Sequence, residues 1–281
     1  MAIGFIGAGK VGFSLGKFFS QGGIPVTGYY SRNRESALEA ALFTGTKQYD
    51  TIGELVHDCD ALFLTVPDGE ITGVYRQLTQ YQISGKHICH CSGAMTAHEA
   101  FPGIDETGAF GYSIHPLFPV SSKLESYREL SGAFFCLEGD DRHIRQWQEQ
   151  ISSLGPGVQI ISGEGKARYH AACAIASNLV CALVGESLDL LETCGFTRRD
   201  GLAALAPLMR SNMEHLIQDG PAGALTGPVE RCDVGTVAKH LSCMSAPEEI
   251  ELYRSASLKL VRIAEEKHPD RDYGPMRDLL K

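Results

Sequence analysis

Apolar and polar residues follow two patterns along the chain. Over residues 1–162, short apolar runs alternate with amphipathic stretches. Runs of this kind, bounded by turn residues, are typical of buried strands in a parallel sheet, and the amphipathic stretches are typical of the helices that cover it. The pattern predicts a doubly wound, mostly parallel α/β sheet. Strands are expected at residues 3–6, 25–30, 60–66, 86–91, 110–115, 133–137 and 158–161.

From residue 166 the pattern changes to helical spacing. Residues 166–194 are rich in Ala and Leu and contain no proline, so they predict one long helix that ends at Gly195. Further helices are expected at 199–218, 235–244 and 247–266. The chain therefore divides into an α/β domain, residues 1–162, and an all-helical domain, residues 163–281.

The first apolar run meets a glycine turn with the spacing G-x-G-x-x-G. In a dinucleotide site, Gly7 permits the sharp turn, Gly9 allows a pyrophosphate to approach the backbone, and Gly12 lets helix and strand pack closely. The free N–H groups of the helix that follows can bind an anion. A turn with a purely structural role is the alternative. The candidate cofactor-binding residues here are Gly7, Ala8, Gly9, Lys10, Val11 and Gly12.

The residues after the second strand indicate which dinucleotide. NAD sites usually have an acidic residue here, whereas this chain has Ser31, Arg32, Asn33 and Arg34. A hydroxyl group and two guanidinium groups can bind a 2′-phosphate with charge-assisted hydrogen bonds. The sequence therefore favours NADP, with Ser31, Arg32 and Arg34 as its ligands. In the alternative interpretation, Ser31 caps a helix at 35–42 and the arginines are solvated.

Further candidate residues follow other strands. Ligands of open α/β sheets bind at the carboxyl ends of strands, where Val66-Pro67 and Ser92-Gly93 are expected beside the cofactor. His115 is expected at the end of its strand, stiffened by Pro116, as a proton donor or substrate anchor. Ser92 could instead terminate its strand, and His115 could simply pack beneath a turn.

Polar residues also interrupt the Ala-rich helical stretch. Lys166 and His170 are one turn apart, and on a continuous helix Ser177 would lie almost above His170, with Asn178 further round. Buried polar groups need partners, so this set satisfies itself or meets a ligand. Arg231 lies in a Gly/Pro loop and could face an anionic substrate or a partner subunit. Asp233 is expected to cap the helix that follows.

Composition limits the function further. The 281 residues carry a net charge of -9 and no basic block, which argues against nucleic acid as the main partner. No apolar run approaches the length of a membrane span, and no signal peptide is evident, so a cytoplasmic protein is expected. The chain has nine cysteines, an odd number that cannot all pair in disulfides, and most of them lie in apolar segments. Both facts favour reduced core thiols. Cys89-His90-Cys91 lacks a second ligand pair, so no metal is expected.

Six motifs in order carry a family resemblance over nearly the whole chain: GFIGAGKVG, TVPDGEI, HCSGAMT, HPLFPV, YHAACAIASN and ALTGPVERCD. Together they resemble a group of Rossmann proteins whose helical second domain is of unknown function. More distantly, the chain is similar to pyrroline-5-carboxylate reductase, ketopantoate reductase, and the 3-hydroxyisobutyrate and 6-phosphogluconate dehydrogenases. The resemblance implies a helical dimerisation domain like the C-terminal domain of the last of these, and an NADP-dependent oxidoreductase.

The resemblance also bears on individual residues. HPLFP is similar to the histidine-proline motif of prephenate dehydrogenases, which implies a catalytic or substrate role for His115. The hydroxyacid dehydrogenases have a catalytic lysine where this chain has Tyr169, so that assignment does not transfer. Arg231-Cys232-Asp233 also departs from the expected Arg-Gly-Asp.

Taken together, the sequence predicts an NADP-dependent oxidoreductase that forms a homodimer. The expected substrate is a small, carboxylated carbonyl, imine or hydroxyacid compound bound between the domains. His170, His115 and Asn178 are the candidate catalytic residues, and Lys166 and Arg231 are the candidate substrate ligands. An NADP-binding sensor without turnover is the alternative. A methyltransferase is disfavoured, because it would usually have an acidic residue in place of Ser31-Arg32.

Overall fold

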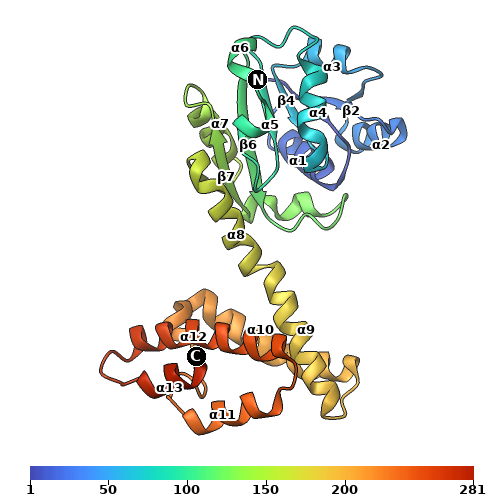
Figure 1. Ribbon diagram of the computed structural model, residues 1–281. Helices are drawn as coiled ribbons and strands as arrows, with labels where there is room; N and C mark the ends of the chain where they lie inside the picture. The colour runs from blue at the N-terminus through green and yellow to red at the C-terminus, as the bar shows by residue number, and fades with distance from the viewer. The chain divides into compact units, whose positions relative to one another are not determined.

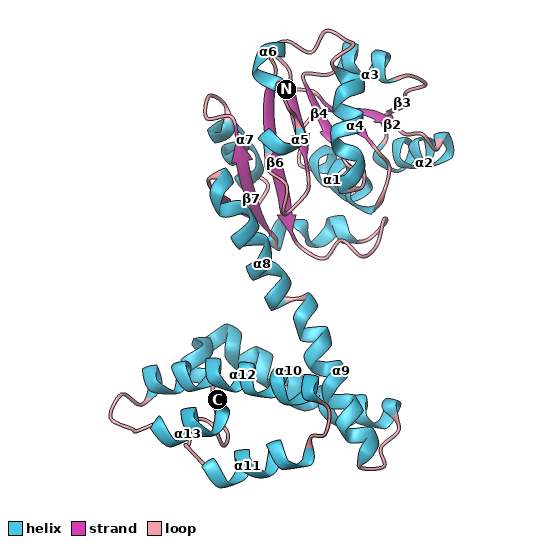
Figure 2. Cartoon of the chain, viewed as in Figure 1, coloured by secondary structure: helices cyan, strands magenta, loops and turns pink.

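The computed structural model describes all residues, 1–281, and they form two compact units, residues 1–177 and 178–281. Figure 2 shows that the strands all belong to the first unit and that the second contains only helices and loops. The predicted fold class, a mostly parallel doubly wound sheet followed by a helical region, is confirmed. The last helix of the first unit, α8 (Lys166–Ala176), belongs to the stretch that the sequence assigns to the helical domain.

One eight-stranded sheet forms the centre of the first unit, with strand order β3-β2-β1-β4-β5-β6-β7-β8. All neighbouring strands are parallel except β6 and β7. The order reverses between β1 and β4, and ligands of open α/β sheets bind at such a reversal. The strands are β1 (Ile3–Ile6), β2 (Val26–Tyr30), β3 (Lys47–Gln48), β4 (Ala61–Leu64), β5 (His87–His90), β6 (Phe110–Leu117), β7 (Phe134–Gly139) and β8 (Gly157–Ile160).

Helices cover both faces of this sheet (Figure 1). The side chains of β4 show why, because Phe63 joins the apolar core on one face while Leu62 and Leu64 join the core on the other. Alternate residues of a strand point to opposite faces, so an uninterrupted apolar run needs cover on both. The covering helices are α1 (Lys10–Gln21), α2 (Arg34–Thr44), α3 (Ile52–Asp58), α4 (Asp68–Leu78), α5 (Ala97–Ala100), α6 (Ile104–Thr107), η1 (Ser126–Gly132) and α7 (Ile144–Ser152).

Strand β6 is longer than predicted. It continues through Pro116 to Leu117, and His115 pairs with Cys136 of antiparallel β7. The expectation that His115 ends its strand is therefore wrong. Proline has no N–H group to donate, but it adopts an extended conformation, and β6 accepts it where the strand is paired with β7.

The prediction of one continuous helix at 166–194 is also wrong. The helix is broken at Ser177, whose backbone angles (φ -122°, ψ -75°) are not helical, and it forms α8 and α9 (Asn178–Thr193). The break follows a helix rich in alanine and precedes one rich in leucine. Ser177 and His170 consequently do not lie on one continuous helix, and the polar set expected from helical geometry does not form in that way.

The second unit consists of five helices: α9, α10 (Arg198–Ala224), α11 (Val234–Cys243), α12 (Pro247–Lys267) and α13 (Gly274–Leu280). Its apolar core comes from α11, α12, α13 and the loop before α11. Asp233 caps α11 as predicted, since its carboxylate accepts the backbone N–H of Thr236 at 3.0 Å. Helix α9 has no buried residue, and its partner α10 buries only Gly201.

A large apolar surface therefore remains uncovered on α9 and α10. Its most exposed side chains include Ile217, which is 79% exposed, and Leu208, which is 67% exposed. Burying such side chains stabilises a protein by roughly 1.5–3 kcal/mol each, so this surface has a strong tendency to associate. The other exposed apolar side chains of α9, α10 and their connection are Leu179, Leu183, Phe196, Leu202 and Met213.

Residues 163–193 are long and apolar enough to cross a membrane by length and composition alone. The expectation that no stretch approaches a membrane span is therefore wrong on that criterion. The criterion is weak for a single helix, because core helices of soluble proteins and signal sequences meet it too. This stretch also contains Lys166, buried in the sheet unit, and the break at Ser177.

Burial of His87 predicts how stability depends on pH. His87 is 8% exposed and its Nδ1 accepts the Nε1–H group of Trp147 at 3.2 Å. Burial lowers its pKa to about 4, below the ordinary 6.5. The unfolded chain therefore binds an extra proton between these values, and stability falls as the pH decreases through this window. The loss from one such group is about 1.4 kcal/mol per pH unit.

We expect the free energy of unfolding of the His87→Gln variant to depend less steeply on pH than that of the wild type, because glutamine keeps an acceptor but does not titrate. Urea unfolding followed by the fluorescence of Trp147, the single tryptophan, measures it in the sheet unit. His57→Gln is the control, because the His57 side chain is 88% exposed. An equal slope in wild type and His87→Gln between pH 6.5 and 4 would contradict the account.

Candidate functional site

The glycine turn lies between β1 and α1, where the strand order reverses. Gly7 has φ 107°, and a Cβ atom there would lie 2.6 Å from the carbonyl oxygen of Thr65. A Cβ atom on Gly12 would lie 2.5 Å from the carbonyl oxygen of Gly7. Both positions therefore exclude a side chain for reasons of packing and, at Gly7, of backbone conformation. Above Gly9 the space is open, since a Cβ atom would meet only the Thr65 oxygen, at 4.0 Å.

Backbone and side-chain bonds fix this turn on both sides. The N–H group of Gly7 donates to Tyr30 of β2 at 2.8 Å, and the N–H group of Thr65, just after β4, donates to Ile6 at 2.9 Å. The hydroxyl of Thr65 also donates to the carbonyl of Gly7 at 2.8 Å. Sequence reasoning did not single out Thr65, because a threonine at the end of a strand has no motif of its own.

Helix α1 begins without a side-chain cap. Gly9 occupies the N-cap position and has no side chain that could accept the first N–H groups of the helix. Lys10 is exposed and Val11 is half-buried. Helix N-termini carry a partial positive charge and unpaired donors, so this end can bind an anion such as a pyrophosphate.

A cavity of about 330 Å³ lies over the turn. It is bounded by the ends of β1, β2 and β4 and by one face of α4. Of the predicted cofactor residues, it includes Gly7, Ala8, Gly9, Ser31, Arg32, Val66 and Pro67. Lys10, Val11, Gly12, Arg34, Ser92 and Gly93 do not line it. The lining also contains Tyr30, Ser36, Thr65 and Glu70, which sequence reasoning did not propose.

After β2, one residue caps a helix and two arginines form exposed ion pairs. Asn33, not Ser31, caps α2, because its side chain accepts the N–H groups of Glu35 and Ser36 at 3.0 and 3.3 Å. The interpretation of Ser31 as the cap is therefore wrong. Arg32 forms an ion pair with Glu70 at 3.3 Å, and Arg34 forms one with Asp50 at 2.7 Å.

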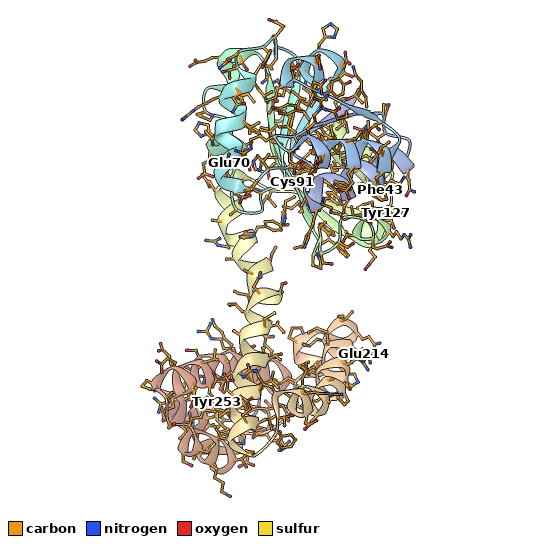
Figure 3. The ribbon with its side chains drawn as sticks, turned by 90° about the vertical axis from the view of Figure 1, so that its right-hand side faces the viewer. Phe43, Glu70, Cys91, Tyr127, Glu214 and Tyr253 are labelled. Atoms are coloured by element: carbon orange, nitrogen blue, oxygen red, sulfur yellow. The ribbon has the colours of Figure 1, made fainter.

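Both arginine side chains are more than 70% exposed. Exposed ion pairs contribute about 0–1 kcal/mol, so either arginine can change partner at little cost. Arg32 is the one at the cavity, and Figure 3 shows its partner Glu70 on α4.

A polar network lies at the end of β5. The hydroxyl of Ser92 donates to Asp68 at 2.6 Å and accepts the N–H group of Met95 at 3.1 Å. The N–H group of Ser92 donates to Nδ1 of His90 at 3.1 Å. Ser92 thus connects the end of β5 to the start of α4, and these bonds hold the loop after β5 in place. Asp68 was not among the predicted site residues.

Burial keeps the neighbouring groups uncharged. It lowers the pKa of His90 to about 3, an effect to which the charge of Lys166 adds. It raises the pKa of the Cys91 thiol to about 12. Figure 3 shows Cys91 in the interior of the sheet unit. No group of three or more His, Cys, Asp or Glu side chains in the structure could hold a metal ion. The expectation of core thiols holds for Cys59, Cys89 and Cys136, which are buried, but not for the three exposed cysteines, Cys181, Cys194 and Cys243.

Two predicted histidines meet beside Gly93. A Cβ atom on Gly93 would lie 3.0 Å from Nε2 of both His115 and His170, so the glycine allows both rings to approach the backbone. The ring centroids of the two histidines are 6.2 Å apart. Nδ1 of His115 is 2.8 Å from the hydroxyl of Tyr169, a contact that the spacing of the motifs did not reveal. The structure therefore brings together His115 of β6, Gly93 in the turn after β5, and Tyr169 and His170 of α8.

Lys166, at the start of α8, is completely buried, and its amine has no hydrogen-bond partner. Burial lowers its pKa, and the nearby carboxylate of Glu138 acts in the opposite direction. Glu138 is itself buried and accepts the N–H group of Ala97 at 2.8 Å. A buried amine without a partner is costly, so this group either stays neutral or stabilises an anion that reaches it.

The remaining predicted site residues belong to the second unit. Asn178 is the first residue of α9, and Arg231 lies in the loop before α11. Both side chains are exposed within that unit.

The chemistry available in the sheet unit is therefore of three kinds. Free helical amides and a cavity bordered by Arg32 suit a molecule with several phosphates. Two histidines can donate or accept a proton beside the Gly93 turn. One buried amine can stabilise a negative charge. Groups suited to phosphate binding and groups suited to proton transfer thus lie at different strand ends of the same sheet edge.

Comparisons with known proteins agree with this architecture. Residues 1–116 match the Rossmann-like domain, and residues 133–260 match a domain of unknown function, DUF2520. The second match begins just before β7, so it includes the last two strands of the sheet as well as α8 and most of the helical unit. No curated protein matches the sequence.

Solved structures share the fold over nearly the whole chain. Protein TM1727 of Thermotoga maritima is 24% identical, with a TM-score of 0.74, over 94% of this chain and 99% of its own. A Bacteroides fragilis protein assigned as an NADP oxidoreductase is 19% identical, with a TM-score of 0.65, over 93% and 98%. A reductive aminase of Aspergillus terreus in complex with NADPH is 14% identical, with a TM-score of 0.59, over 99% and 92%.

These identities are all below 25%, so the solved structures establish the fold alone. The chain consists of a Rossmann-like domain followed by a DUF2520 domain.

Proposed function

We propose that the protein is an NADP-dependent oxidoreductase. It transfers a hydride between the nicotinamide and a small, carboxylated carbonyl, imine or hydroxyacid substrate. The observation that carries this proposal is the cavity over an uncapped glycine turn, with Ser31 and Arg32 in its lining. Proteins with the same fold include one assigned as an NADP oxidoreductase and an NADPH-bound reductive aminase.

The residues present fit a dinucleotide. The open space above Gly9 and the free N–H groups at the start of α1 suit a pyrophosphate. Ser31 and Arg32 would hold the adenosine ribose and its 2′-phosphate, and Arg34 could join them after leaving Asp50. Val66 and Pro67 would flank the dinucleotide on its way to Ser92 and Gly93.

NADP is favoured over NAD because of the charges at this edge. A 2′-phosphate would replace Glu70 as the partner of Arg32, exchanging a weak exposed ion pair for a charge-assisted contact. No acidic residue follows β2 directly to bind a free 2′-hydroxyl. Arg32 thus acts as the main discriminator between the two coenzymes.

NADPH, when bound, supplies the hydride. The side chains of this chain supply orientation and a proton. His115 and His170 both face the Gly93 turn and are the groups placed to donate to the substrate oxygen or nitrogen. Lys166 would stabilise the substrate carboxylate, which offsets the cost of the buried amine. For Asn178 and Arg231 the roles expected from the sequence, positioning and anchoring the substrate, stay predictions.

We also propose a homodimer in the cytoplasm. The uncovered apolar surface of α9 and α10 supports association through the helical unit, and a second copy of the chain offers the same surface. The membrane-length criterion met by residues 163–193 has the same explanation, since an interface helix is apolar along its exposed face.

The alternative is an NADP-binding sensor without turnover. In an enzyme, His170 acts on the substrate, whereas in a sensor it need not. We expect NADPH to lose its absorbance when 2-oxo acids or cyclic imines are added, and His170→Ala to lower turnover by roughly 10²–10⁴-fold with NADPH affinity unchanged. His98→Ala, an exposed histidine outside the site, is the control. NADPH binding without any oxidation across the panel would favour the sensor.

Coenzyme preference tests the role of Arg32. We expect Arg32→Ala to weaken NADPH binding by about tenfold to a hundredfold, the loss of one or two charge-assisted contacts, and to leave NADH binding nearly unchanged. Calorimetric titration with both coenzymes measures this. Arg128→Ala serves as the control, because Arg128 pairs with Glu125 on a different part of the unit. Equal losses for both coenzymes would contradict the assignment of Arg32.

The oligomeric state tests the role of α9 and α10. We expect sedimentation to give twice the chain mass for the wild type, and the chain mass for a Leu208→Glu, Ile217→Glu double variant. Two carboxylates in an apolar interface would remain unpaired, which opposes association. Leu42→Glu, on an equally exposed leucine of the sheet unit, should remain a dimer. A monomeric wild type would refute the proposal.

A further inference from the structure

The two ring nitrogens of His115 face different groups. Nδ1 is 2.8 Å from the hydroxyl of Tyr169 on α8. Nε2 faces the turn after β5, since a Cβ atom on Gly93 would lie 3.0 Å from it. His115, Gly93 and Tyr169 all belong to the same compact unit. The ring therefore connects a tyrosine on one side with the candidate reaction site on the other.

The imidazole of His115 is neutral at neutral pH. Burial lowers its pKa to about 4, and the neighbouring Lys166 and His170 act in the same direction, while Asp68 opposes them. A neutral imidazole carries one proton, on either Nδ1 or Nε2. Which nitrogen carries it decides whether the side facing Gly93 is a donor or an acceptor.

Tyr169 keeps its proton under the same conditions. Burial raises the pKa of its hydroxyl, and the neighbouring thiols of Cys136 and Cys173 raise it further. The hydroxyl can donate its proton to a thiol sulfur or to the His115 nitrogen. A ring nitrogen is a much better acceptor than sulfur, so donation to Nδ1 is the stronger choice.

We propose that Tyr169 is a positioning residue that fixes the tautomer of His115. Its hydroxyl donates to Nδ1, so Nε2 carries the proton and presents an N–H donor toward the Gly93 turn. If the proposed function holds, this donor polarises the carbonyl oxygen of the substrate during hydride transfer. His115 keeps its proton in this role, because a neutral imidazole can stabilise a developing oxyanion by a hydrogen bond. His170, beside the same turn, then donates the proton that converts the alkoxide to the alcohol.

The position of Tyr169 in the chain explains why a tyrosine suits it. Tyr169 lies one turn after Lys166 on α8, and Lys166 is the buried amine of the same region. A lysine in place of Tyr169 would add a second amine beside Lys166, and the two amines would repel each other when protonated. The neutral tyrosine hydroxyl orders His115 without adding charge. Donor groups from His115 and Lys166 then suit a substrate with a carbonyl oxygen and an anionic group better than a protonated imine.

Nitrogen NMR of histidine-labelled protein tests this proposal without requiring turnover. In the wild type, the His115 resonances, identified by their loss in His115→Gln, should show a protonated Nε2 and an Nδ1 that accepts a hydrogen bond. In Tyr169→Phe, the Nδ1 signal should move toward that of a free acceptor and the opposite tautomer should become populated. Tyr81→Phe, on an exposed tyrosine, is the control. A protonated Nδ1 in the wild type, or a Tyr169→Phe spectrum identical to it, would overturn the proposal.

Kinetics give a second reading that separates this proposal from the proposed function. With a 2-oxo acid that the wild type reduces, Tyr169→Phe should lower kcat about tenfold to a hundredfold, and KM for NADPH should stay constant. An unchanged kcat would count against Tyr169. Failure of the wild type to bind NADPH or reduce any compound would refute the proposed function, while the NMR result would still decide the tautomer.

Discussion

The contact between the glycine turn and Thr65 is the constraint on which the site depends. Thr65 bonds the backbone of β1 through its N–H group and that of Gly7 through its hydroxyl, and it leaves no room for a side chain on Gly7 or Gly12. The turn is thereby held between β2 and β4, at the point where the strand order reverses. Because the turn is fixed, Gly7, Ala8 and Gly9 border a defined cavity just before the uncapped start of α1, and the functional proposal rests on that geometry.

Much of the fold was predictable because it depends on local patterns. The apolar run of β4 requires cover on both faces, and Gly7-Ala8-Gly9 requires a turn, so the covered parallel sheet and the candidate cofactor edge follow from short segments. The predictions fail where contacts between residues far apart in the sequence determine where a strand or helix ends. His115 lies inside a strand because β7 pairs with it across Pro116, and the long helix breaks at Ser177, where no proline or glycine signals an end.

The candidate site was predictable to a similar degree. Motif spacing pointed to Ser31 and Arg32, which do line the cavity, and to His115 and His170, which do meet beside Gly93. Thr65, Asp68 and Tyr169 were missed, since their roles arise from partners far away in the sequence. The sequence offered Ser31 as the cap of α2, but the cap is Asn33. Both residue types can cap a helix, so only the geometry of the turn shows which one does. A side chain that acts through another residue leaves little signal in a single sequence.

Hydrogen exchange with and without NADPH tests the central claim most directly, because it reads the backbone amides that are proposed to bind the pyrophosphate. The account predicts that NADPH slows exchange at residues 9–12 and 31–36, and that it does so more than NADH at the second segment. Protection confined to other parts of the chain, or none at saturating coenzyme, would contradict the claim that the glycine turn and the residues after β2 hold the dinucleotide.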